Sequence, residues 1–176
     1  MSRTKKRVVF ACALFVTIGT NIIMSSSSIG QPLLKQYGDG TGMLDFLSYY
    51  SGERAVAALG GLGPEGAWVY TRLLLIDFLF IIGTAIIFSM AMRFLVQWAR
   101  LPSKWLRLHW LGILRSGFDA VENILLLFGL HAAAGSQTVL GVAGIVTLLK
   151  WVSMFALVAA ALVVTIMGIR NRVKQR

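Results

Sequence analysis

Five charged side chains and one amide occur inside long apolar stretches of the sequence. Four of them lie in the segment ILRSGFDAVENILLLFGL, where a spacing of three to four residues places the three charged ones on one face of a helix and the amide on its flank. The full set comprises Asp77, Arg115, Asp119, Glu122, Asn123 and Lys150. Carboxyl groups and cations in apolar surroundings are typical of a site for a proton, an ion or a small ligand, and an Asp–Glu pair could also act as general acid and base.

No further motif turns these residues into a recognisable enzyme. The sequence contains no nucleophile–base pair, metal-ligating triad or phosphate-binding loop beside them, so we assign no catalytic residue and no metal ligand, and any cofactor is unknown. His109 and His131 could each ligate a haem, but neither has an evident partner on another predicted helix. Cys12 is the single cysteine, which excludes an intramolecular disulfide, and we interpret it as a small buried apolar residue.

The composition indicates a membrane protein. Of the 176 residues, 57% are hydrophobic and the mean hydropathy is +0.75, whereas soluble domains have about 45–50% apolar residues. Four apolar segments have roughly the 20 residues that a helix needs to cross about 30 Å of hydrocarbon. They cover about residues 8–24, 68–92, 110–133 and 139–169. A helix makes all its backbone hydrogen bonds within itself, as lipid requires. We therefore predict an all-α fold in which residues 1–176 form a single domain, a four-helix transmembrane bundle.

A short outer cap segment is predicted between the first two helices, at about residues 25–63. Within it, Ser51 can cap a short helix that has Glu53 in its first turn and Gly60-Gly61 as its stop. The segment could be a packed cap, a substrate lid or a partner surface.

The first apolar segment resembles a signal peptide, because serines follow it at positions 25–28. We nevertheless expect a retained helix, since a polar stripe recurs at helical spacing and would face other helices. The stripe consists of Thr17, Thr20, Asn21 and Ser25.

The distribution of the net charge of +10 predicts the topology. Lys and Arg cluster before the first, between the second and third, and after the fourth predicted helix. Because such clusters stay on the cytoplasmic side, we predict a multi-pass protein of the inner (plasma) membrane with both termini cytoplasmic. The clusters also suit anionic lipid headgroups, whereas no basic module typical of nucleic-acid binding is present. A membrane-protein partner or a homo-oligomer remains open.

The buried charges must meet one another. A charge at the centre of a spanning helix costs about 2.5–3.5 kcal/mol even on the most lenient scale. We therefore expect the acids of the second and third helices to converge with Lys150 and Arg115. With three acids against two cations, at least one carboxyl group should keep its proton at neutral pH.

The order of the motifs resembles a group of small, largely uncharacterised bacterial four-helix integral membrane proteins. The resemblance covers roughly residues 50–130. It rests on Gly60-Gly61-Leu62-Gly63, Gly66, Tyr70, Asp77 and the D-x-x-E-N motif Asp119-Ala120-Val121-Glu122-Asn123. It implies a four-helix bundle and no established activity, and it does not include Arg115 or Lys150.

Three hypotheses follow. The first is a protein with a buried charged site for a small ligand, proton or ion, formed by the six residues named above. The second is a structural or accessory subunit of a membrane complex, whose charge network only stabilises the bundle. The third is a lipid-modifying membrane enzyme, which would require a lateral opening that reaches Asp119.

Overall fold

The computed structural model describes residues 2–132 and 136–174, and within these ranges it is all-α and without strands. Its elements are α1 (Arg3–Ser25), α2 (Gln31–Leu34), the 3-10 helix η1 (Leu44–Phe46), α3 (Gly52–Gly60), α4 (Gly63–Trp98), the 3-10 helix η2 (Ser103–Leu108), α5 (His109–His131) and α6 (Ser136–Val173). The predicted helices are present, and α1, α4 and α6 extend beyond the predicted bounds. The predicted end of the third helix, at 133, lies outside the described residues.

Three of the four long helices are long and apolar enough to cross a membrane. They cover Thr4–Ser25, Gly63–Trp98 and Gln137–Val173. The remaining one, α5, has 23 residues but carries Arg115, Asp119 and Glu122, so its composition alone does not mark it as a span. Three helices are therefore consistent with the predicted membrane-protein character.

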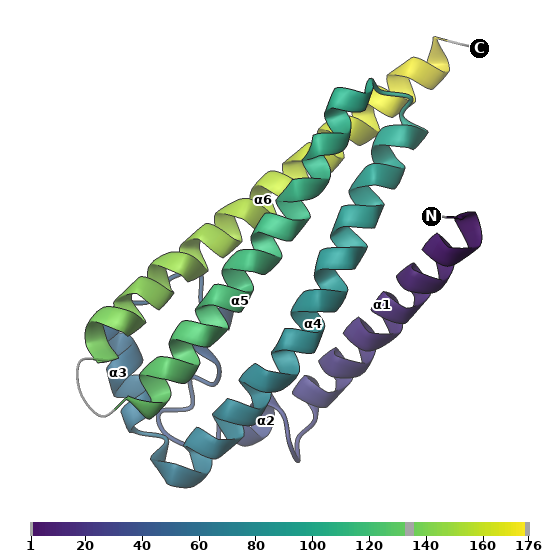
Figure 1. The fold of residues 1–176 in the computed structure, drawn as a ribbon. Helices are drawn as coiled ribbons and strands as arrows, with labels where there is room; N and C mark the ends of the chain where they lie inside the picture. The colour runs from purple at the N-terminus through teal and green to yellow at the C-terminus, as the bar shows by residue number, and fades with distance from the viewer. Residues whose placement is uncertain (1, 133–135, 175–176) are drawn as a thin grey trace.

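The long helices pack in the order α1, α4, α5, α6 (Figure 1). The main contacts of α1 are with α4, while α5 lies between α4 and α6. Small residues allow close approach: a side chain on Gly83 of α4 would overlap Thr17 of α1, and one on Gly129 of α5 would overlap Leu140 of α6. The interpretation of Cys12 as buried is wrong, because α1 packs mainly on α4 and Cys12 is exposed.

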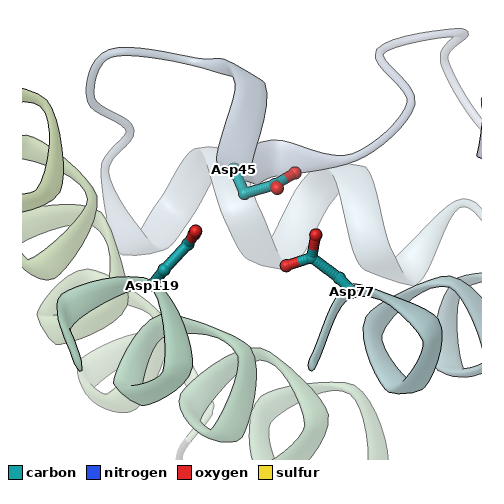
Figure 2. Close-up of side chains that lie close together, drawn as sticks. All are labelled: Asp45, Asp77 and Asp119. Atoms are coloured by element: carbon teal, nitrogen blue, oxygen red, sulfur yellow. The ribbon is translucent and has the colours of Figure 1, made fainter. Parts of the chain in front are cut away.

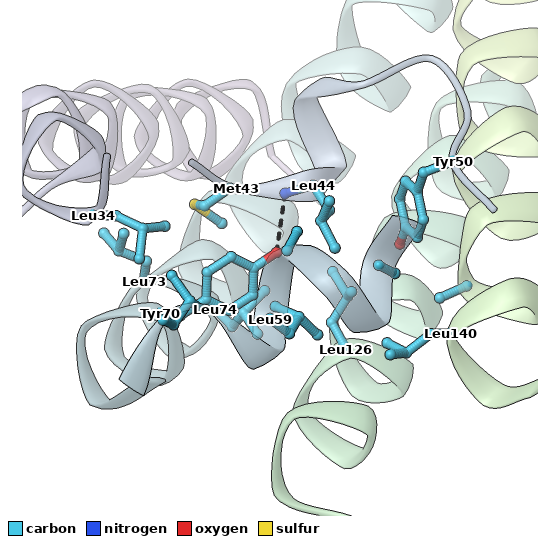
Figure 3. Close-up of a cluster of buried hydrophobic side chains, with 14 of the residues drawn as sticks. Leu34, Met43, Leu44, Tyr50, Leu59, Tyr70, Leu73, Leu74, Leu126 and Leu140 are labelled. Atoms are coloured by element: carbon cyan, nitrogen blue, oxygen red, sulfur yellow. Dashed lines mark hydrogen bonds between the residues drawn. The ribbon is translucent and has the colours of Figure 1, made fainter. Parts of the chain in front are cut away.

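The segment between α1 and α4 forms a cap, built from α2, η1 and α3, at one end of the long helices (Figure 1). The predicted short helix is confirmed as α3, whose N-terminal Ser51 side chain accepts a hydrogen bond from the Arg54 N–H. A buried apolar cluster joins the cap to α4, α5 and α6 (Figure 3). Its largest fully buried members include Leu34, Met43, Leu44, Tyr50, Tyr70, Leu73, Leu74, Leu126 and Leu140.

Hydrogen bonds fix the position of the cap on the long helices. The Tyr70 hydroxyl of α4 accepts a bond from the Leu44 N–H at 3.0 Å (Figure 3). The Trp151 indole of α6 donates to the Leu47 carbonyl at 2.9 Å. The main chain around η1 thus donates one hydrogen bond to α4 and accepts one from α6, so the cap is fixed to both helices.

Gly144 should be essential for this packing. A Cβ there would overlap the Tyr50 carbonyl oxygen, so Gly144→Ala should lower the stability of the purified protein by about 1–3 kcal/mol. The matched control is Gly117→Ala on α5, where an added Cβ meets nothing within 4 Å and should be neutral or stabilising. Thermal melting in detergent measures both, and equal melting temperatures would contradict the close approach of the cap to α6.

Candidate functional site

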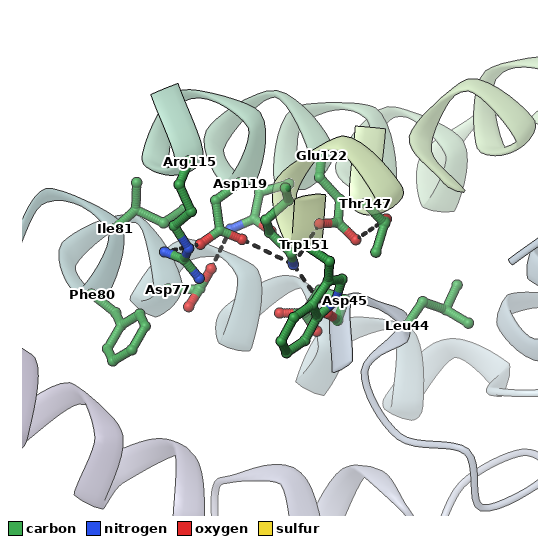
Figure 4. Close-up of polar contacts among 12 residues, drawn as sticks. Leu44, Asp45, Asp77, Phe80, Ile81, Arg115, Asp119, Glu122, Thr147 and Trp151 are labelled. Atoms are coloured by element: carbon green, nitrogen blue, oxygen red, sulfur yellow. Dashed lines mark hydrogen bonds and ion pairs between the residues drawn. The ribbon is translucent and has the colours of Figure 1, made fainter. Parts of the chain in front are cut away.

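The predicted polar residues lie in one network between α4, α5 and α6 (Figure 4). Five of the six side chains are buried, and Arg115 is half-buried. The buried ones are Asp77, Asp119, Glu122, Asn123 and Lys150. The helical spacing of α5 and the cost of isolated charges therefore predicted their convergence correctly.

Asp119 is held by two cations. Its Oδ2 lies 2.7 Å from Arg115 Nη1, one helical turn away, and its Oδ1 lies 3.1 Å from Lys150 Nζ on α6. Lys150 Nζ also lies 2.7 Å from Glu122 Oε2. One ammonium group thus ties α6 to two acids of α5.

Glu122 has neutral partners as well. The Thr147 hydroxyl donates to its Oε1 at 2.6 Å and the Tyr50 hydroxyl donates to the same atom at 3.4 Å. Asn123 acts on the neighbouring acid: its amide donates to Asp77 Oδ2 at 2.8 Å. Neither Thr147 nor Tyr50 was among the predicted site residues, because a lone hydroxyl in an apolar helix or loop gives no distinctive signal.

Asp45 is the fourth acid of the cluster and was not predicted. It lies on η1, is 8% exposed, and points toward Asp77 and Asp119 (Figure 2). One carboxylate oxygen from each of these three residues lies within 4.8 Å of the other two. Its position between Leu44 and Phe46 was the available signal, since an acid flanked by large apolar residues indicates burial, but the sequence does not show where a loop residue points.

Within the described part of the chain, no cation contacts the carboxylate of Asp77, which accepts from the Asn123 amide, or that of Asp45. Lys150 Nζ donates to the main-chain oxygen of Asp45 at 3.0 Å instead, and the buried Oδ1 of Asp45 has no hydrogen-bond donor among the described residues. Burial raises the pKa of the Asp45 carboxyl well above its usual value; Lys150 opposes this rise, whereas the three neighbouring acids add to it. The cluster therefore holds four acids and two cations.

A pocket of about 570 Å³ leads to this cluster. Its charged lining comes from Lys35, Asp45, Asp77, Arg115, Asp119 and Lys150, of which Lys35 is exposed, and the lining also includes residues of α1, the cap and α6. The polar stripe of α1 contributes to it in part: Asn21 and Ser25 line the pocket, while Thr20 is buried and donates to main-chain carbonyls of its own helix.

The two histidines lie at opposite ends of α5, as predicted, but both have partners on α4. His109 Nε2 lies 2.6 Å from Arg93 Nη2, and His131 Nε2 lies 3.1 Å from the Thr71 hydroxyl. These partners hydrogen-bond the histidines across to α4, which runs beside α5 along its length, and neither partner is a residue that would ligate a haem with them. Their opposite positions prevent them from ligating one common haem.

No protein-family model matches the chain, and no curated protein or solved structure is significantly similar to it. The resemblance to small bacterial four-helix membrane proteins stays a prediction.

Lys150 should contribute most to the stability of this network. Lys150→Met leaves Glu122 buried without a cation, so we expect a loss of about 3–5 kcal/mol. Adding Glu122→Gln should restore part of that loss, because the remaining buried charge is removed. Melting of the single and double variants gives the coupling energy.

The control for this cycle is Lys104→Met, which removes an exposed cation of η2 and should change stability by less than about 0.5 kcal/mol. Additive losses in the Lys150–Glu122 cycle would show that the pair does not stabilise the folded chain.

Proposed function

We propose that this chain is a multi-pass protein of the bacterial inner membrane, with α1, α4, α5 and α6 as a four-helix transmembrane bundle. The exposed face of α5 supports a fourth span. It carries large apolar residues that suit contact with lipid, while the charges of α5 turn toward α4 and α6. The apolar face consists of Ile113, Leu114, Val121, Ile124 and Phe128.

Both termini are proposed to be cytoplasmic. The start of α1 and the end of α6 lie away from the cap (Figure 1), and the described members of the cation clusters lie in or beside these parts of the helices and in η2. A separate pocket of about 600 Å³ at η2 and the start of α5 is lined by two cations and two tryptophans, Lys104, Trp105, Arg107 and Trp110, beside apolar residues, a combination suited to a lipid with an anionic headgroup at the membrane interface.

The function that the geometry supports best is binding of a small ligand, proton or ion at the buried charged site. The observation that carries it is the excess of acid: four buried carboxyl groups share two cations at the end of a pocket. Acids in membrane interiors are costly and are kept where they serve a bound or moving charge.

A purely structural network is the main alternative. Structural networks stabilise when each member is paired, because an unpaired buried polar atom costs about 1–3 kcal/mol. Within the cluster, Asp45 Oδ1 and Asn123 Oδ1 have no hydrogen-bond partner among the described residues, which favours a site over a structural network. A lipid-modifying enzyme is the second candidate, favoured by the apolar Met24, Phe80 and Met154 in the pocket lining, which suit an acyl chain.

The proposed topology predicts opposite labelling of two exposed positions. In a Cys12→Ser background, Ser48→Cys in the cap should react with a membrane-impermeant maleimide in intact spheroplasts, because it lies on the outer side. Lys174→Cys should react only after the membrane is permeabilised. Labelling of Lys174→Cys in intact spheroplasts would place the C-terminus outside and contradict the proposal.

The site proposal predicts that two isosteric substitutions affect the stability of the folded chain differently. Asp45→Asn removes an unpaired acid while keeping the main-chain bond to Lys150, so the melting temperature in EDTA should be unchanged or raised. Asp119→Asn weakens two ion pairs and should cost about 3 kcal/mol. If Asp45→Asn is as destabilising as Asp119→Asn, the acids serve the structure and the site proposal is wrong.

A further inference from the structure

Three carboxylates from three separate elements converge at the charged end of the pocket. Asp45 comes from η1, Asp77 from α4 and Asp119 from α5, and their side chains point toward one another (Figure 2). One oxygen from each lies within 4.8 Å of the others. We propose that Asp45, Asp77 and Asp119 bind one oxygen-preferring divalent cation, an inference that rests on the proposed function of the same site.

The spacing of the oxygens fits one coordination sphere. Oxygens bind Mg²⁺ at about 2.0–2.1 Å and Ca²⁺ at about 2.3–2.6 Å, so two ligands on opposite sides of one ion lie roughly 4–5 Å apart. The three oxygens fall inside that span. A ligand set of carboxylates selects Mg²⁺, Mn²⁺ or Ca²⁺ over metals that prefer nitrogen or sulfur.

The unpaired state of Asp45 is the second, independent observation. Its side chain is more than nine-tenths buried and aimed into the cluster, yet its Oδ1 has no donor among the described residues and no described cation contacts its carboxylate. The neighbouring cation, Lys150, donates to the main-chain oxygen of Asp45 and not to its carboxylate. The Asp45 carboxylate therefore keeps an oxygen without a protein partner among the described residues.

A divalent cation matches the charge of the fully ionised cluster, the state in which all its carboxylates can act as ligands, so its binding displaces any proton that they keep in its absence. With Asp45, Asp77, Asp119 and Glu122 ionised against Arg115 and Lys150, the net charge is −2. One divalent cation neutralises it, and each carboxylate oxygen has lone pairs left to ligate. Asp119 already contacts two cations, so Asp45 and Asp77 are the stronger ligands and Asp119 the weaker.

The amide of Asn123 orients one of these ligands. It donates to Asp77 Oδ2 at 2.8 Å and leaves the other oxygen of that carboxylate for the cation (Figure 4). Outer partners of this kind fix the direction of a ligating carboxylate. No metal ligand was predicted from the sequence, because the third acid comes from the cap.

The test is binding of Mn²⁺ alone to the full chain, reconstituted in nanodiscs of neutral phosphatidylcholine so that lipid headgroups do not compete. Loss of the electron paramagnetic resonance signal of free Mn²⁺ gives the stoichiometry and affinity. We expect one Mn²⁺ per chain, displaced by Ca²⁺ or Mg²⁺, and an affinity weakened by at least about tenfold in Asp45→Asn and in Asp77→Asn.

Asp39→Asn is the matched control, because Asp39 is an exposed acid of the same cap whose Oδ1 accepts from the Thr41 N–H; its Mn²⁺ affinity should equal that of the unchanged chain. Absence of stoichiometric Mn²⁺ from the unchanged chain would overturn the cation proposal, as would binding that survives both site substitutions. Should a variant fail to fold, the stoichiometry of the unchanged chain and its displacement by Ca²⁺ decide the outcome. The chain could fail to bind Mn²⁺ and still show the predicted stability difference between Asp45→Asn and Asp119→Asn. That result would reject the cation but keep the proposed site, so failure of the cation proposal can be told from failure of the site proposal.

Discussion

The ammonium group of Lys150 contacts three oxygens from two parts of the chain: carboxylates of Asp119 and Glu122 on α5, and the main-chain carbonyl of Asp45 in the cap. A lysine has three N–H donors, so this one group can serve all three acceptors. In a low-dielectric interior, an ammonium without these partners would cost several kcal/mol. One buried charge therefore links the orientation of α6 to that of α5 and to the position of η1.

The same arrangement contains more carboxyl groups than cations. Lys150 and Arg115 offset two of the four carboxyl groups, and the amide of Asn123 provides Asp77 with a neutral partner. The cap brings Asp45 to the cluster without bringing a further cation to its carboxylate. A pocket that is lined by both paired and unpaired members of the cluster reaches it from α1, the cap and α6. A bound species that supplies positive charge would complete the network.

The sequence predicted the parts of the site that obey helical periodicity or the energetics of burial. The spacing of Arg115, Asp119 and Glu122 placed them on one face, and the cost of isolated charges required Asp77 and Lys150 to join them. Asp45 could not be predicted, because no periodicity fixes the direction of a side chain in a 3-10 turn. The exposure of Cys12 was missed for a different reason: hydropathy does not distinguish a helix surrounded by others from one that packs mainly on a single neighbour.

The most direct test of the central claim is an electron cryomicroscopy map of the reconstituted full chain, at a resolution that shows ordered ions, inspected between Asp45, Asp77 and Asp119. We expect non-protein density that contacts at least two of the three carboxylates, at distances near about 2.0–2.6 Å if it is the proposed cation. Carboxyl groups bonded directly to one another, around a closed space without such density, would show that the acids only hold the helices and the cap together.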